Sequence, residues 1–353
     1  MASQGALLIL DGAYGEGGGV TVRTALTMAA LTQQPFRITS VRGAQKRQGL
    51  NSEDLLLIRA LAQSTHAEVI GAELGSMQFS FLPTRTPRAL NERLDVGDDR
   101  KEDGHANAQV VLVTLLPVMA RTGAYSALFA VGETFGRNVL GFDAYANVTL
   151  PALQAFGLHA YPDMSVAGFG LHSRGEVATE IEPSALVGVD LSQRGELLAV
   201  RASITTGELP EPVAERGEGH LANMARSAGI PLEADCCFPR SSTPGAHVTL
   251  WAEFERGFGS ASAFGARGVR IETVAQQAFS GFMDWYRSDS TVDANLADQL
   301  IVTAAMAEGH TVMKVHRLSP RLLTMIWVIK QFLPIHITVK GAENQPGSIT
   351  IRR

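Results

Sequence analysis

Residues 11–19 read Asp-Gly-Ala-Tyr-Gly-Glu-Gly-Gly-Gly and decide how the start of the chain folds. They follow an apolar run at 6–10, which predicts a buried strand, and precede apolar residues at helical spacing over 20–31. A glycine-rich turn between a strand and a helix lets backbone N–H groups approach an anion at the helix N-terminus. An aspartate and a glutamate within the turn are unusual for a simple phosphate-binding loop.

Neither common phosphate-binding fingerprint fits this turn. A P-loop requires Lys and then Ser or Thr after its last glycine, and this chain has Val20 and Thr21 there. The dinucleotide fingerprint also fails, because Gly15 and Gly17 are followed by Val20 at the position of the third glycine. On spacing alone, a tight turn between packed elements explains the run as well as an anion site does.

Composition describes an ordinary globular chain. Its 353 residues are 45% hydrophobic and 18% charged, which excludes a disordered protein and is enough for two domains or one repeated architecture. The net charge of −5 gives no overall attraction to nucleic acid, so any RNA contact needs a local basic patch. No apolar run approaches the roughly 20 residues of a membrane helix, so we expect no membrane partner.

The cysteines and the N-terminal sequence predict a cytoplasmic protein. The two cysteines, Cys236 and Cys237, are adjacent, which excludes a disulfide framework and suits a reducing compartment. No basic segment followed by a long apolar one begins the chain, so we do not expect secretion.

Three segments share the order helix, strand, helix, strand, strand and recur about every 85–90 residues, which predicts an α/β (α+β) fold with an internal repeat. The first has Val20–Leu31, Phe36–Val41, Asn51–Ser64, Ala67–Leu74 and Met77–Leu82. The second has Ala108–Arg121, Tyr125–Gly132, Phe142–Phe156, His159–Asp163 and Glu176–Ile181. The third has Ala294–Glu308, Thr311–Arg317, Pro320–Leu333, Ile335–Lys340 and Ser348–Arg352.

The second and third segments are separated by about 100 residues more than the repeat requires. We therefore predict a smaller inserted α/β domain at 184–268 and a large repeat domain formed by 1–183 and 269–353.

Polar residues open the helix of the third segment. Asp298 and Gln299 fall near its N-terminus, where they can bind a nucleobase or a metal-bound phosphate. Ordinary first-turn polar residues are the alternative, and on local sequence they are the commoner case.

Two basic stretches are candidate anion sites. His316, Arg317 and Arg321 surround a predicted helix start, with Ser319 as N-cap and Pro320 as the first helical residue. Arg42, Lys46 and Arg47 form the best local basic patch and could contact phosphate, although solvated loop charge is the commoner explanation. The remaining histidines that lack partners at diagnostic spacing are interpreted as structural: His66, His159, His220, His247 and His336.

Over nearly its whole length the chain resembles the RNA 3′-terminal phosphate cyclase family. The order and spacing of the pieces carry the resemblance: Leu10-Asp11-Gly12, Gly15 to Gly19 with Arg23, Arg42 with Gly49-Leu50, Gly132 and Thr134, Gly265 to Gly268 with Glu272, Ala297-Asp298-Gln299, and Thr324 with Phe332-Leu333-Pro334. The resemblance implies three repeats related to the C-terminal domain of translation initiation factor three, plus a smaller inserted domain.

The same resemblance implies a nucleotide-dependent reaction of the ligase class on RNA 3′ ends. A histidine attacks the α-phosphate of ATP and forms a histidine–AMP adduct, AMP passes to the RNA 3′-phosphate, and the 2′-hydroxyl displaces it to give a 2′,3′-cyclic phosphate. ATP and Mg²⁺ or Mn²⁺ are the implied cofactors. Glu16 and Asp298 are the implied metal candidates, and Arg23 and Arg42 would contact RNA phosphates. The residues implied around the nucleotide are Glu16, Asn295, Leu296, Ala297, Asp298 and Gln299.

The chain departs from the family pattern at four places. Arg321 occupies the position of the nucleophilic histidine, three residues before Thr324. Arginine stays protonated and offers no lone pair to attack phosphorus. The other departures are Val113 in place of a Gln, Ser-Glu-Asp at 52–54 in place of Arg-Gln-His, and Leu171 with Ser-Arg-Gly at 173–175 in place of a Pro and three glycines.

Three functions remain open from the sequence. The first is a cyclase that uses another nucleophile or attacks ATP without an enzyme adduct. His316 is the rescue candidate through a register shift or local bulge, although a plain strand or turn histidine is the commoner explanation. The second is a cyclase-like protein without adenylylation chemistry that binds RNA or a ribonucleoprotein partner; the family has a branch that lacks the histidine and resembles a ribosome-assembly factor. The third is an enzyme resembling the enolpyruvyl transferases, which bind anionic substrates with several Lys and Arg and which the glycine-rich turn disfavours.

Overall fold

A computed structural model describes residues 6–95 and 107–353, which form a mixed α/β fold with four small mixed sheets. The helices are α1 (Gly19–Thr32), α2 (Ser52–Thr65), α3 (Ala108–Met119), α4 (Phe142–Ala144), the π-helix η1 (Tyr145–Thr149), α5 (Leu150–Ala155), α6 (Glu211–Ala228), α7 (Ile271–Tyr286), α8 (Ala294–Met306) and α9 (Pro320–Phe332). The strands are β1 (Leu8–Asp11), β2 (Phe36–Thr39), β3 (Glu68–Ile70), β4 (Phe79–Leu82), β5 (Asn91–Asp95), β6 (Ser126–Gly132), β7 (Ala160–Val166), β8 (Gly175–Ile181), β9 (Asp190–Leu191), β10 (Leu197–Gly207), β11 (Leu232–Cys237), β12 (Gly245–Phe254), β13 (Phe258–Phe264), β14 (His310–Val315), β15 (His336–Lys340) and β16 (Gly347–Arg352).

Three of the sheets share one pattern of strand pairing. Their strand orders are β1-β2-β4-β3, β5-β6-β8-β7 and β9-β14-β16-β15. In each sheet the first pair is parallel and the next two pairs are antiparallel. Helices α1, α3, α8 and α9 contact one another between these sheets, so one hydrophobic core includes side chains from all three.

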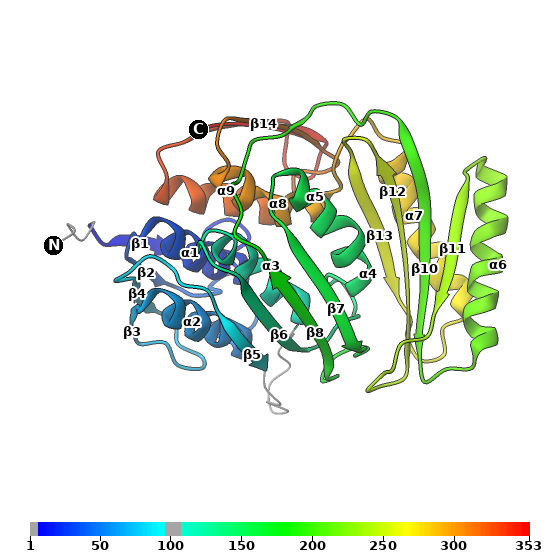
Figure 1. The fold of residues 1–353 in the computed structure, drawn as a ribbon, viewed down its shortest axis with the longest axis horizontal. Helices are drawn as coiled ribbons and strands as arrows, with labels where there is room; N and C mark the ends of the chain where they lie inside the picture. The colour runs from blue at the N-terminus through cyan, green and yellow to red at the C-terminus, as the bar shows by residue number, and fades with distance from the viewer. Residues whose placement is uncertain (1–5, 96–106) are drawn as a thin grey trace.

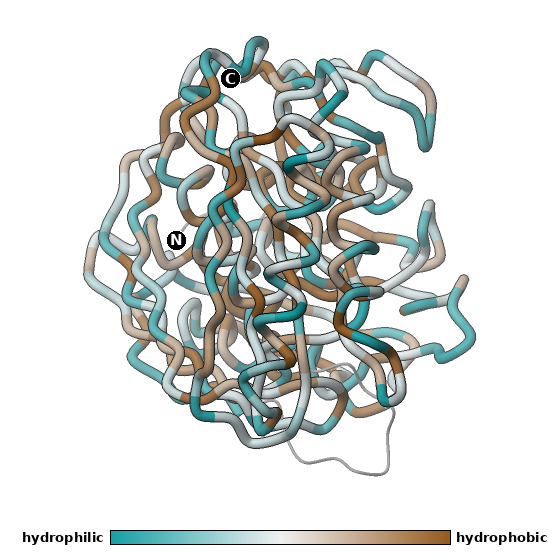
Figure 2. The backbone as a smooth tube through the Cα atoms, turned by 90° about the vertical axis from the view of Figure 1, so that its right-hand side faces the viewer, coloured by the Kyte–Doolittle hydropathy of each residue, from teal (hydrophilic) through white to brown (hydrophobic). Residues whose placement is uncertain are grey.

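The fourth sheet, in the order β11-β10-β12-β13, lies at the end of the molecule opposite to β1 (Figure 1). It has a hydrophobic core of its own, which it shares with α6 and α7. Along the chain its strands fall between β9 and β14, which belong to one sheet. Hydrophobic and hydrophilic residues are interspersed along the described backbone (Figure 2).

The predicted helices and strands of the three segments are present, with two differences. The apolar run at 6–10 is not a buried strand, because β1 is an edge strand in which Leu10 is 1% exposed but Ile9 is 63% exposed. The predicted helix at 142–156 is interrupted by η1. Since Pro151 has no N–H to donate to the carbonyl of residue 147, the hydrogen-bond ladder shifts by one residue just before it.

Candidate functional site

A cleft of about 1630 Å³ lies between the fourth sheet and the rest of the molecule. The glycine-rich turn with α1 and the loop at 45–50 contribute to its lining, and so does the loop at 136–141. The fourth sheet contributes residues 260–264 of β13. The first turns of α2, α3, α8 and α9 also reach it, so several helix N-termini face one space.

The glycine-rich turn is attached to α9 at the far end of the chain. The backbone N–H of Glu16 donates to Oγ1 of Thr324 at 2.9 Å, and the ring of Tyr14 stacks on Trp327 with 4.1 Å between centroids. Gly15 has φ +63°, and a Cβ there would lie 2.3 Å from the Thr324 hydroxyl oxygen. Only glycine fits this contact. The turn therefore packs against α9 and also forms part of the wall of the cleft.

Asp298 belongs to α8, and its buried carboxylate contacts the start of α9. Its Oδ1 accepts from the Ser319 hydroxyl at 3.0 Å, and its Oδ2 lies 3.6 Å from Nε of Arg321. Ser319 in turn accepts from the N–H of Leu322, so it caps α9 as predicted. Burial raises the pKa of Asp298 to about 6, while Arg321 and Ser319 favour its ionised form and the charge of Glu16 opposes it.

The start of α8 holds the remaining predicted nucleotide residues. The backbone N–H groups of Asn295 and Leu296 donate to Oδ1 of Asp293, the N-cap of this helix. Both residues line the cleft. Ala297 is fully buried in the hydrophobic core and does not line it.

Gln299 lines the cleft from the same helix. Its Oε1 accepts a hydrogen bond from the hydroxyl of Thr149, the last residue of η1. The π-helix thereby fixes the side chain of Gln299 at the cleft wall.

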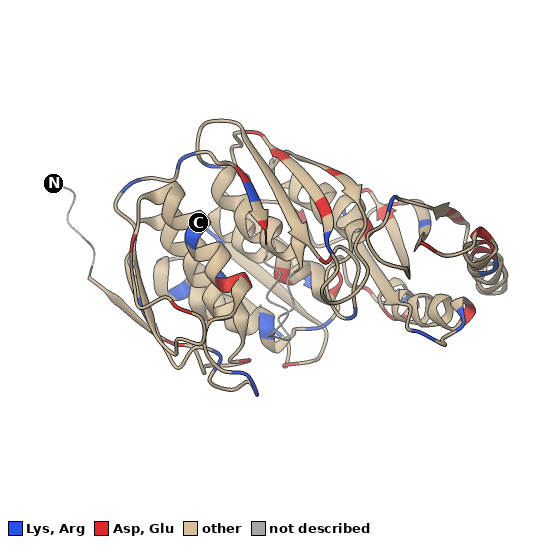
Figure 3. Cartoon of the chain, turned by 90° about the horizontal axis from the view of Figure 1, so that it is seen from below, with Lys and Arg blue, Asp and Glu red and all other residues tan. Residues whose placement is uncertain are grey.

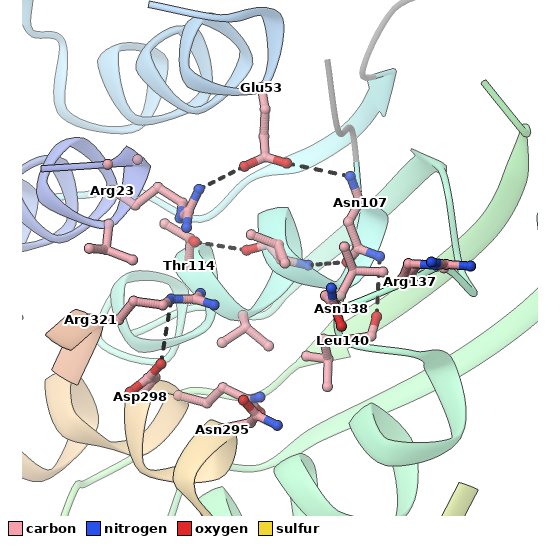
Figure 4. A pocket seen from close by; sticks show the side chains of 18 of the residues that line it. Arg23, Glu53, Asn107, Thr114, Arg137, Asn138, Leu140, Asn295, Asp298 and Arg321 are labelled. Atoms are coloured by element: carbon pink, nitrogen blue, oxygen red, sulfur yellow. Dashed lines mark hydrogen bonds and ion pairs between the residues drawn. The ribbon is translucent and has the colours of Figure 1, made fainter. Parts of the chain in front are cut away.

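Arg23 and Arg42 converge over the start of α1 and are both ion-paired. Nη1 of Arg23 lies 2.9 Å from Oε1 of Glu53 (Figure 4), and Nη2 of Arg42 lies 2.7 Å from Oδ2 of Asp54. A Cβ on Gly19 would lie 2.7 Å from Arg42 and 3.0 Å from Arg23. The two carboxylates come from the first turn of α2, where Asp54 also completes a capping box.

A second buried carboxyl group lies near Glu53. Asn107 donates its backbone N–H to Glu53 at 3.4 Å and its side-chain amide to the carbonyl of Glu133 at 3.2 Å. Burial raises the pKa of Glu53 despite Arg23. Burial and the charge of Glu53 raise the pKa of Glu133 to about 7. The sequence reasoning missed Glu133, since neither a motif nor a charge cluster marks it.

The positions of His316 and His247 relative to the cleft are the reverse of what the sequence suggested. His316 is absent from the described residues that line the cleft, and its N–H donates to the carbonyl of Val292. His247, interpreted as structural, does line the cleft. Burial lowers the pKa of His247 to about 3, and its Nδ1 is hydrogen-bonded to the hydroxyl of Thr249 at 3.1 Å. His247 is therefore a neutral, buried histidine.

Comparison with known proteins identifies the family. The model of the family "RNA 3′-terminal phosphate cyclase" matches residues 14–339. The chain belongs to this family. It is 32% identical to the RNA 3′-terminal phosphate cyclase of Methylococcus capsulatus over 347 residues, which covers 98% of this chain and 96% of that protein. It is also 32% identical to the proteins of the same name from Nostoc punctiforme and Salmonella typhimurium, with 96% of this chain and 97% of each relative covered.

In this cyclase-family chain, some of the positions that the sequence analysis expected to depart from the family pattern lie at the cleft. The cleft is lined by Arg321, Val113 and Glu53. Asp54 does not line it but forms an ion pair with Arg42, which does. Leu171 is outside the lining and 45% exposed. Arg321, Val113 and Glu53 therefore contribute to the charge and shape of the cleft, whereas Leu171 does not.

The acidic side chains of the cleft lining decide whether a divalent metal ion would fit here. Within 6–95 and 107–353, no three His, Cys, Asp or Glu side chains gather to form a metal site. Glu16 and Asp298 both line the cleft, and one or two carboxylates with substrate phosphates are what Mg²⁺ commonly uses. In the same part of this cyclase-family chain, every helix is too short or too polar to cross a bilayer.

Proposed function

We propose that the protein binds RNA 3′-phosphate ends in the cleft and forms no histidine–AMP intermediate. The observation that carries this proposal is the place of Arg321. It lies in the first turn of α9, lines the cleft and is paired with Asp298 beside Glu16. By position it stands where the family's nucleophilic histidine is expected, and a guanidinium has no lone pair to attack phosphorus.

Arg321 is well suited to bind a phosphate instead of attacking one. Its side chain is 45% exposed, and within residues 6–95 and 107–353 its one ion pair is through Nε to Asp298. Both Nη groups can therefore form a fork on a phosphate group. Asp298 orients the guanidinium, and this function requires no covalent chemistry.

We further propose that a nucleotide occupies the part of the cleft between the glycine-rich turn and α8. Glu16, Asn295, Leu296, Asp298 and Gln299 line that part and would contact ATP, with Mg²⁺ or Mn²⁺ held by Glu16 and Asp298. Bound there, the ion would neutralise phosphate charge. Ala297 supports α8 only through packing.

We also propose that the three sheets with one pairing pattern are repeats and that the fourth sheet is an insertion. The pairing of β9 with β14 supports this arrangement, because the chain leaves their sheet after β9, forms the fourth sheet and then returns to the same sheet at β14. The insertion expected at 184–268 then extends to about residue 286, because α7 packs in the second core.

Incubation with α-labelled ATP and a divalent metal tests the proposed function. We expect no covalent label on the protein, in contrast to a histidine-containing relative run in parallel. We also expect a short single-stranded RNA with a 3′-phosphate to bind more tightly than the same RNA with a 3′-hydroxyl. Covalent AMP, or a cyclic RNA end as product, would support an active cyclase instead.

A further inference from the structure

We infer that Arg137, Arg317 and Arg321, at the mouth of the cleft, hold the RNA backbone, and that the deeper Arg23 and Arg42 do not. The inference rests on the proposed function. It assigns backbone binding to Arg137 and Arg317, which the family pattern does not single out, together with Arg321. The partner is a single-stranded polynucleotide, recognised through successive phosphodiester groups.

The charges of the deeper arginines, Arg23 and Arg42, are neutralised by the carboxylates with which they form ion pairs. The side chains of Arg23 and Arg42 are 17% and 16% exposed, and those of Glu53 and Asp54 are 6% and 0% exposed. A phosphate that took either arginine from its partner would leave a carboxylate buried without a counter-ion, which is strongly unfavourable. Each pair also has no net charge to attract an anion from solution.

The outer arginines are differently placed. Arg137 and Arg317 are exposed, line the cleft and form no ion pair with any residue of the described ranges. Arg321 uses only Nε in its contact with Asp298. Three guanidinium groups at the cleft therefore keep most of their donors for a ligand.

The three arginines come from separate elements, which suits a strand better than a single phosphate. Arg137 follows β6, Arg317 follows β14, and Arg321 opens α9. Figure 4 shows Arg137 and Arg321 on different sides of the pocket, with Asn138 next to Arg137. Elsewhere acidic and basic residues are interspersed along the chain (Figure 3), so cations of the cleft lining such as these three must supply the attraction that the net charge of −5 does not.

The test is binding of a fluorescent single-stranded RNA with a 3′-phosphate, measured by anisotropy over a series of KCl concentrations. The variant is Arg137→Gln with Arg317→Gln, which leaves Arg321 in place. The matched control is Arg226→Gln, an exposed arginine on α6 outside the cleft lining. Both changes are at exposed positions, and thermal melting verifies that the variants fold.

We expect the double variant to bind at least tenfold more weakly, with the slope of log K against log[KCl] reduced by about 1.4, or about 0.7 for each lost phosphate contact. The control should behave as the unmodified protein does. If the double variant keeps the affinity and the slope, the inference is overturned while RNA binding stands. If the unmodified protein binds no RNA at any salt concentration, the proposed function fails and the inference with it.

Discussion

Nη1 of Arg23 lies 2.9 Å from Oε1 of Glu53, and the glutamate side chain is almost wholly buried. The pair joins α1 to the first turn of α2 at the inner wall of the cleft. Arg42 and Asp54 repeat the same arrangement next to it. A protein of overall negative charge thus uses two of its cleft arginines to neutralise its own carboxylates.

Replacing Glu53 by Gln should release Arg23 for an external anion. We expect Glu53→Gln to bind 3′-phosphate RNA severalfold more tightly, with a salt slope larger by about 0.7 because one more phosphate is contacted. The control is Glu308→Gln, which removes the same charge at an exposed site outside the cleft lining. Equal affinity in the two variants would show that Arg23 is not restrained by Glu53.

Asp143 should make the stability of the protein depend on pH. Burial raises its pKa to about 6, although hydrogen bonds from Thr205 and Ser203 favour the ionised form. Between about pH 4 and pH 6 the folded state therefore holds more protons than the unfolded state, and stability falls as pH rises. Above pH 6 the cost of the buried charge is fully present.

Asp143→Asn removes this charge and keeps an oxygen to accept from Thr205, which lies at 2.9 Å. We expect the variant to be more stable than the unmodified protein at about pH 7.5, by on the order of 2–3 kcal/mol. The gain should shrink toward pH 4, as measured by thermal melting across the pH range. The exposed Asp163→Asn serves as control, and a loss of stability at high pH would refute the assignment.

Restoring a histidine at position 321 should not by itself restore adenylylation. We expect Arg321→His to show no acid-labile AMP label with α-labelled ATP. The reason is that Arg23 and Arg42, which would offset phosphate charge, stay paired with Glu53 and Asp54. Labelling of this single variant would show that the nucleophile alone is missing.

Thr324→Val should destabilise the protein by removing the acceptor of the Glu16 N–H. Valine keeps the shape but leaves this donor without a partner, at a cost of about 1–3 kcal/mol. Thr32→Val is the matched control, because the Thr32 hydroxyl donates only to the carbonyl of Met28 in its own helix. We expect a clear drop in Tm for the first variant and little change for the second. Similar Tm values would mean that the turn is held mainly by the Tyr14–Trp327 stack.

The sequence predicted the helices well where apolar spacing and a capping residue agree. Ser319 and Pro320 mark the start of α9 correctly. By contrast β13, with the sequence FGSASAF, has small residues of low strand propensity and was not predicted. It is a strand because β12 pairs with it, an effect of tertiary structure that local sequence does not carry.

The same limit applies to the site. Glu16, Arg23, Arg42, Asp298 and Arg321 line one cleft, and motifs marked each of them in the sequence. What the sequence did not reveal is which charges pair, because α1 meets α2 and α8 meets α9 only in the folded chain. The roles assigned to these residues remain predictions for the experiments above.

The contact of Glu16 with Thr324 spans 308 positions of the chain. A growing polypeptide leaving the ribosome exposes the glycine-rich turn early, long before its partner helix has been translated. Contacts between residues this distant in sequence form slowly, and they form after the local contacts. The two walls of the cleft that Glu16 and Thr324 join can therefore come together only near the end of synthesis, after α9 has been translated.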